Sequence, residues 1–137
     1  MLTRVLFLTS FFVSGVAMSF DVVEEIKKCP SSPNCVSSLA KSKKHYMEPW
    51  TYSGEKAAVM ATLREKVLSL PRVKLVGEGS DYYHFVFTSK ILRFKDDVWF
   101  FVDGESKKIH FKSASRLGRS DFGVNKERLL GLKKRIF

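Results

Sequence analysis

Side chains able to bind a ligand are concentrated in the segment 113–125. This segment holds serines, arginines, an aspartate, glycines and an asparagine within thirteen residues. An arginine guanidinium there offers a planar pair of donors to a carboxylate or a phosphate. Together with two preceding aspartates, the segment forms a candidate polar cluster, either a ligand site or a structural anchor. Its members are Asp96, Asp97, Ser113, Ser115, Arg116, Asp121 and Asn125.

The adjacent Asp96 and Asp97 do not predict a paired-carboxylate acid/base site. Neighbouring side chains of a strand point to opposite faces of the sheet. A turn between about 103 and 108 brings the two aspartates opposite residues 110–116. One of them should therefore lie near Ser113, Ser115 or Arg116. Such a pair is either a cross-strand ion pair that anchors the next loop or a holder of an anionic or polyhydroxyl ligand.

The end of the segment leads into a predicted helix, for which Asn125 is the expected N-cap. Backbone amides at a helix N-terminus attract anions, but Asp121 in front of them could fill that role internally. No Ser-His-Asp triad is justified, because the serines lack a nucleophile-elbow context.

Cys29 and Cys35 are the only cysteines, and in an exported chain two cysteines most often pair. We therefore predict a disulfide. A structural zinc site needs four ligands, and no histidine shares a ligand-like spacing with a cysteine. The two-residue spacing of redox motifs is absent as well. No metal or cofactor is expected.

Residues 1–17 are predicted to be a signal peptide. Arg4 precedes an apolar run over 5–13, and the small residues Gly15, Val16 and Ala17 follow it. The run is shorter than the roughly 20 residues of a membrane span; an uncleaved anchor is the alternative. Residues 18–137 then form a single domain, secreted or periplasmic.

The formal net charge of +10 belongs mostly to the C-terminal quarter. Residues 107–137 hold ten lysines or arginines against Asp121 and Glu127. This imbalance indicates an anionic partner, namely an envelope polymer or lipid headgroups rather than nucleic acid. A solvated helix face is the structural alternative. The predicted basic surface consists of Lys126, Arg128, Lys133, Lys134 and Arg135.

The predicted fold is α+β, with an antiparallel sheet of three to four strands packed with two helices on one face. An irregular N-terminal arm covers 18–52. A helix is expected from Ser53, as its cap, to Leu70, and Pro71 ends it. A second helix follows Gly123, and Gly131 within it indicates either close packing or a weak helix. Strands are expected over 73–77, 82–88, 98–102 and 109–115, the last two joined as a hairpin through Asp103-Gly104.

Three blocks of the sequence, at 29–38, 93–100 and 113–128, resemble the signature blocks of the domain of unknown function 1499 family. The resemblance spans roughly residues 29–132. It implies a domain of bacterial envelopes or plastids, often found behind a signal or membrane anchor, and carries no established activity. The polar and glycine positions that it implies are Asn34, Asp96, Asp97, Ser113, Ser115, Arg116, Asp121, Gly123, Asn125 and Arg128.

The leading functional hypothesis is non-catalytic binding of an anionic or polar partner through the C-terminal basic surface and the Arg116 cluster. One alternative is an enzyme of unknown reaction, such as a hydrolase, that uses Asp97, Ser115 and Arg116. Another is a structural partner in an envelope protein complex. A deep pocket would favour the enzyme, a flat basic face would favour binding, and an exposed apolar patch would favour the protein partner.

Overall fold

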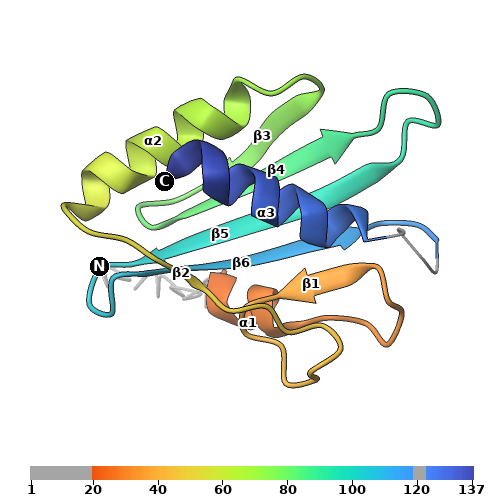
Figure 1. The fold of residues 1–137 in the computed structure, drawn as a ribbon, viewed down its shortest axis with the longest axis horizontal. Helices are drawn as coiled ribbons and strands as arrows, with labels where there is room; N and C mark the ends of the chain where they lie inside the picture. Colours follow the sequence, from red (N-terminus) through yellow and green to blue (C-terminus); the bar gives the residue numbers. More distant parts are fainter. Residues whose placement is uncertain (1–19, 119–122) are drawn as a thin grey trace, which may run out of the picture.

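One antiparallel sheet of six strands organises the computed structural model, which describes residues 20–118 and 123–137 (Figure 1). The strand order is β1-β6-β5-β4-β3, and β2 also pairs with β6. The strands are β1 (Cys35–Ser37), β2 (Trp50–Thr51), β3 (Val73–Glu78), β4 (Tyr82–Thr88), β5 (Lys95–Asp103) and β6 (Lys108–Ser115). The helices are α1 (Val22–Lys27), α2 (Lys56–Leu68) and α3 (Val124–Ile136).

The predicted α+β class is confirmed, and the N-terminal arm is more regular than expected. The four central strands were all predicted, but β5 begins at Lys95 rather than at residue 98. The arm adds α1 and the two short strands β1 and β2, both paired with β6. Strands of two or three residues between prolines carry too little periodicity to be recognised in the sequence.

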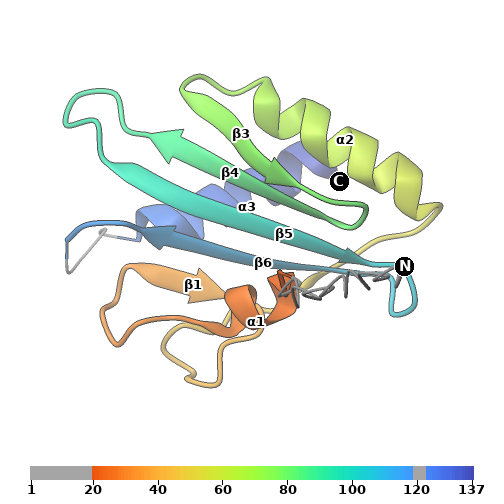
Figure 2. The ribbon, with the colours of Figure 1, turned by 180° about the vertical axis from the view of Figure 1, so that it is seen from behind.

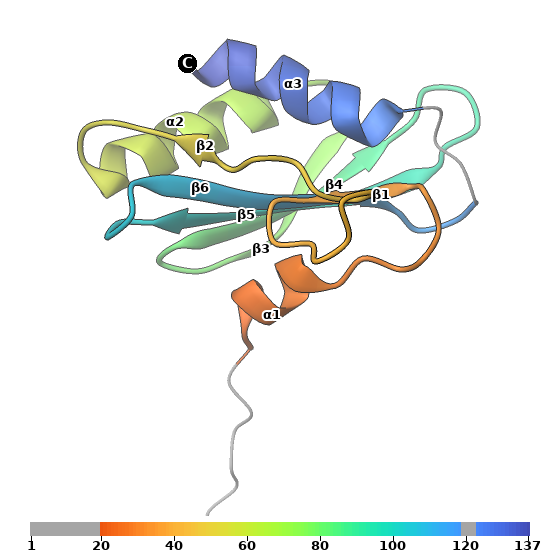
Figure 3. The same ribbon diagram turned by 60° about the horizontal axis from the view of Figure 1, so that its bottom comes forward.

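The two faces of the sheet differ in what covers them. Figure 3 shows α2 and α3 above the sheet and α1 below it, and Figure 2 shows α1 from its own side. We call these the helix face and the α1 face. The core lies on the helix face, where Phe85, Phe100 and Phe111 are fully buried against Leu63 and Leu129. Complete burial of each such side chain contributes about 1.5–3 kcal/mol.

Helix α2 begins later than its sequence suggests. Its N-cap is Glu55, with no side-chain cap bond, so the predicted Ser53 cap is wrong. Gly54 lies between them with φ at +86°, a left-handed backbone that no helix can include. Within the helix, Met60, Leu63 and Val67 recur at helical spacing and are buried against the sheet.

Helix α3 corrects two further expectations. Its N-cap is Gly123, with φ at +81°, and Asn125 lies inside the first turn with its side chain fully buried. Asn125 is therefore not the N-cap, because contacts with the sheet draw its side chain inward. A Cβ at Gly131 would meet no atom of another residue within 4 Å, so close packing does not explain this glycine.

Candidate functional site

The consecutive residues Asp96 and Asp97 lie on opposite faces of β5, as the alternation of a strand requires. Asp96 is paired with Ser115 in the β5–β6 ladder, and Asp97 with Ala114. The Asp96 side chain points to the helix face and the Asp97 side chain to the α1 face. The candidate polar cluster is therefore divided by the sheet into two separate groups.

The group on the helix face is a buried hydrogen-bond network, which we call the Asp96 network. Arg128 of α3 donates through Nη2 to Asp96 Oδ2 (2.6 Å) and through Nη1 to Ser113 Oγ (3.0 Å) and Asn125 Oδ1 (2.8 Å). Ser113 Oγ donates to the same Asn125 oxygen (2.6 Å). Both Ser113 and Asn125 have no solvent exposure. A buried polar network of this kind stabilises one packing arrangement of α3 on the sheet.

The Asn125 amide also connects this network to the N-terminal arm. Its Nδ2 donates to the Asn34 carbonyl oxygen (3.2 Å) and to Ser115 Oγ (3.1 Å). The Ser115 backbone nitrogen donates to the same Asn34 oxygen (3.0 Å). Asn34 Nδ2 in turn donates to the carbonyl oxygen of Gly118 (2.6 Å). Asn34 therefore joins β6, α3 and the connection between them.

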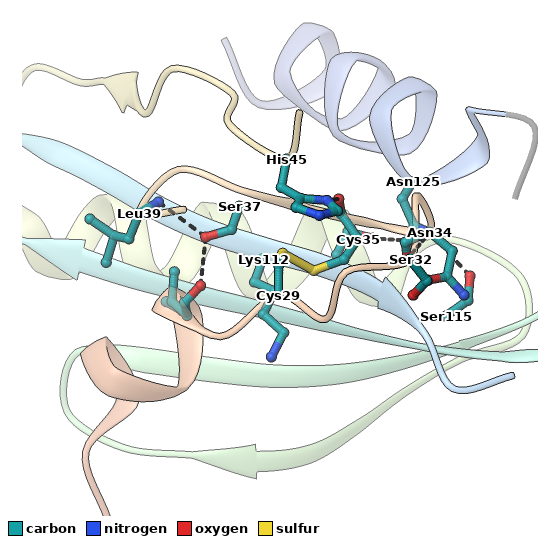
Figure 4. Close-up of a disulfide and its surroundings, with 12 residues drawn as sticks. Cys29, Ser32, Asn34, Cys35, Ser37, Leu39, His45, Lys112, Ser115 and Asn125 are labelled. Carbon is teal, nitrogen blue, oxygen red and sulfur yellow. Dashed lines mark hydrogen bonds between the residues drawn. A yellow bond between two sulfur atoms is a disulfide. The ribbon is translucent and has the colours of Figure 1, made fainter. Parts of the chain in front are cut away.

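Asn34 is held in place by the predicted disulfide, which joins Cys29 to Cys35 (Figure 4). Cys35 is the first residue of β1 and pairs with Ala114 of β6. Its carbonyl oxygen lies 2.9 Å from Nδ1 of the buried His45. The disulfide closes the loop that presents Asn34, so this clasp supports the Asp96 network.

The group on the α1 face, which we call the Asp97 cluster, is more exposed. Arg116 donates through Nε to Asp97 Oδ2 (2.8 Å) and through Nη2 to Asp97 Oδ1 (2.9 Å). His84 Nε2 lies 2.7 Å from Asp97 Oδ1, and its ring stacks on Trp99 with 3.6 Å between centroids. Partial burial alone would raise the pKa of Asp97. The hydrogen bonds and charges of His84 and Arg116 outweigh burial and hold this pKa well below its usual range.

A depression of about 390 Å³ opens on the α1 face beside Arg116. Its walls are the ends of β3, β4 and β5, with Val76, Val86 and Thr88 among them. The described residues that line it include no carboxylate. We call it the basic depression, because its lining includes the cationic residues Arg72, Lys74, Arg93, Lys95 and Arg116.

Strand geometry brings these cations together from three separate stretches of the chain, 72–74, 93–95 and residue 116. Lys95 lies two residues before Asp97 and so shares its face, and the Arg116 nitrogen donates to the Lys95 carbonyl oxygen (3.0 Å). Arg72 and Arg93 stand in the connections at the same end of the sheet, with φ at +56° and +57°. Left-handed backbone is uncommon for residues other than glycine, and Lys107 in the β5–β6 turn also adopts it. Such a basic depression is suited to hold an anionic group.

The C-terminal basic residues do not adjoin this depression. Lys126, Lys133, Lys134 and Arg135 are exposed on α3, which covers the opposite face of the sheet. Arg128 does not belong with them, because only 13% of its side chain is exposed and its guanidinium lies over the Phe87 ring at 4.8 Å. Its assignment to the basic surface is wrong, since the buried Asp96 carboxylate draws it toward the sheet.

The three residues of the enzyme hypothesis do not converge. Ser115 Oγ accepts from Asn125 on the helix face, whereas Asp97 and Arg116 meet on the α1 face. Asp121 lies outside the described residues. Within residues 20–118 and 123–137, no group of three or more His, Cys, Asp or Glu side chains is placed to hold a metal ion.

A family model described as Protein of unknown function (DUF1499) matches residues 25–136. The chain belongs to the DUF1499 family. No curated protein and no solved structure gives a significant match. In this DUF1499 domain, the polar positions implied by the sequence resemblance, apart from Asp121, are divided between the buried Asp96 network and the more exposed Asp97 cluster. No helix in the described part of the domain is long and apolar enough to cross a membrane.

Sequence reasoning missed His84 and most of the basic depression. The spacing of Lys95 and Asp97 was a usable signal, because residues two apart on a strand share a face. His84 had no such signal, since its pairing with Trp99 depends on the register of β4 against β5. Arg72 and Arg93 lie in connections, whose course follows from tertiary packing.

Proposed function

We propose that this DUF1499 domain is a non-catalytic envelope domain that binds an anionic partner through the basic depression beside Arg116. The observation that carries the proposal is the gathering of five cationic side chains around one open depression of about 390 Å³. Arg116 is paired with Asp97, whereas the other four cations form no ion pair with the described residues. Like charges that collect in this way attract an anion and raise its local concentration.

The Asp97 cluster holds Arg116, one of the cations of this proposed site, in a defined orientation. Asp97 orients Arg116 through two hydrogen bonds, and His84 holds Asp97 from the other side. An oriented guanidinium loses less side-chain entropy when it receives a phosphate or carboxylate. The cluster therefore acts in the proposal as a support for Arg116 rather than as an acid/base pair.

The exposed cations of α3 form a second, separate contact in this proposal. They lie across the sheet from the depression, so a small anion would occupy one of the two surfaces. An anionic polymer long enough to pass around the domain would reach both. Export to the envelope, through the predicted signal peptide at 1–17, is part of the same proposal, and a disulfide accords with an oxidising compartment.

The test is an NMR titration of the full chain with glycerol phosphate, chosen as a small soluble phosphate ester. We expect shifts of backbone resonances around the depression. The double variant Lys74→Gln/Lys95→Gln should bind at least about tenfold more weakly, because hydrogen bonds to charged groups are lost. The matched control Lys133→Gln/Lys134→Gln removes the same charge from α3 and should bind like the wild type. The opposite ranking of the two variants would move the site to α3.

A further inference from the structure

The connection between β4 and β5 exposes large apolar side chains at the same end of the sheet as the basic depression. Ile91 is 85% exposed, Leu92 is 68% exposed, and Phe94 beside them is also exposed. Leu117 is exposed on the connection that leaves β6 at this end (Figure 1). Scattered exposed apolar residues are ordinary, but Ile91, Leu92 and Phe94 are grouped in one short turn, and such a group indicates an interaction surface. We call Ile91, Leu92, Phe94 and Leu117 the apolar tip.

The turn that carries Ile91 and Leu92 is ordered by hydrogen bonds at its base. The Ser89 nitrogen donates to the Phe94 carbonyl oxygen (2.9 Å), and the Phe94 nitrogen donates to Ser89 Oγ (2.8 Å). The left-handed backbone of Arg93 completes the reversal of the chain. The turn therefore presents its two aliphatic side chains outward in a defined geometry.

Cationic residues surround the apolar tip without intervening acids. Lys90 and Arg93 flank the two aliphatic residues, and Lys95 and Arg116 follow toward the sheet. The segments 88–95 and 116–118 contain no aspartate or glutamate. Asp96 and Asp97, which follow the first segment, are paired with arginines, and Asp121 after the second lies outside the described residues. Apolar side chains therefore lie at the outer end of the turn, and cations lie between them and the sheet.

We propose that the apolar tip docks this domain on an anionic lipid bilayer. Ile91 and Leu92 enter the boundary of the acyl chains, and the cations of the basic depression bind the headgroup phosphates above it. The proposal rests on the proposed function and names a lipid phosphate as the anionic group. In an anionic bilayer the acyl chains lie deeper than the phosphates. In the domain the apolar side chains likewise lie farther out than the cations, so each group meets its partner when the tip enters the bilayer.

Other partners use only part of this arrangement. A soluble anion makes no use of Ile91 and Leu92. A protein partner with an apolar pocket makes no use of the five cations that line the depression. Interfacial binding uses both, because its strength scales with the buried apolar area together with attraction to anionic lipids.

The experiment is co-sedimentation of the full chain with vesicles of phosphatidylglycerol and phosphatidylcholine in equal parts, or of phosphatidylcholine alone. We expect binding to the anionic vesicles only. Ile91→Ser/Leu92→Ser should weaken it by about tenfold or more, because two aliphatic side chains lose their burial. The matched control Val124→Ser/Leu130→Ser removes two exposed apolar residues from α3 and should bind like the wild type. Thermal unfolding verifies that all variants are folded.

Glycerol phosphate separates this inference from the proposed function. The Ile91→Ser/Leu92→Ser variant should keep the wild-type affinity for glycerol phosphate while losing vesicles. Wild-type vesicle binding by that variant would overturn membrane docking and leave anion binding intact. Equal binding to both kinds of vesicle, or to neither, would overturn it as well. If Lys74→Gln/Lys95→Gln retains both glycerol phosphate and vesicles, the proposed function itself is overturned.

Discussion

Two aspartate–arginine pairs that start from neighbouring residues of β5 have opposite environments. In the Asp96–Arg128 pair the exposed fractions of the side chains are 11% and 13%, and the pair belongs to a network that includes fully buried groups. In the Asp97–Arg116 pair they are 24% and 46%, and the pair borders the basic depression. Only the face of the strand distinguishes the two aspartates, yet it assigns one to the interior and the other to a solvent-facing surface.

This difference indicates that the polar groups important for stability and those available for binding lie on opposite faces of the sheet. Breaking a buried ion pair leaves an uncompensated charge and is strongly destabilising. An exposed pair in water is worth about 0–1 kcal/mol. The helix face therefore carries the polar groups that hold α3 in place, and the α1 face keeps polar groups that can change partners.

The largest effect is expected for Arg128→Met. This change leaves the Asp96 carboxylate buried without its cation and removes donors to Ser113 and Asn125. The free energy of unfolding should fall by about 3–5 kcal/mol, measured by urea denaturation. Arg135→Met, an exposed position on the same helix, is the control and should change stability by no more than about 0.5 kcal/mol. If Arg128→Met lowers the free energy of unfolding by less than about 1 kcal/mol, the Asp96–Arg128 pair contributes no more than an exposed ion pair.

The second prediction concerns the clasp, which is linked through Asn34 to the buried Asp96 network. Cys29→Ser/Cys35→Ser should lower the free energy of unfolding by about 2 kcal/mol, through the loop entropy of the unfolded chain. Because Asn34 links the clasp to the Asp96 network, this change should couple with Arg128→Met in a double-mutant cycle by at least about 0.5 kcal/mol. Simple additivity there would indicate that the clasp acts independently of the network.

A smaller effect is expected for Arg116→Ala. Its side chain is nearly half exposed, and His84 still contacts Asp97 when the guanidinium is removed. The free energy of unfolding should fall by about 1 kcal/mol or less, by the same denaturation assay. A loss of about 3 kcal/mol or more would instead make Arg116 a structural anchor and would weaken the proposed binding role.

The smallest effect is a pH dependence that originates at Asp97. Its folded-state pKa is depressed below the unfolded value of about 3.9, so its contribution to stability is present above that value. The contribution is lost as pH falls through the folded-state pKa. The melting temperature of Asp97→Asn should therefore decline less than that of the wild type between about pH 5 and pH 2. Parallel curves for the two proteins would contradict the assignment.

Local rules were sufficient for much of the fold. The strand predicted over 109–115 is β6, and Asp103-Gly104 predicted the hairpin that joins it to β5. Caps were less predictable. At both long helices a glycine with positive φ lies at or just before the N-cap, where a polar residue had been expected. A polar residue near a helix start can equally serve packing, and only its surroundings decide between these roles.

The sequence by itself determined the α+β class, the disulfide, the opposite orientation of Asp96 and Asp97, and the proximity of one of these aspartates to Ser113, Ser115 or Arg116. Each depends on chain neighbours or on a short hairpin, where the spacing of residues dictates geometry. Tertiary structure alone decided that Arg128 returns from α3 to Asp96 and that Arg72 and Lys74 approach Arg116 across the sheet. These contacts join segments far apart in the chain, and their geometry follows from how helices and strands pack rather than from any local pattern.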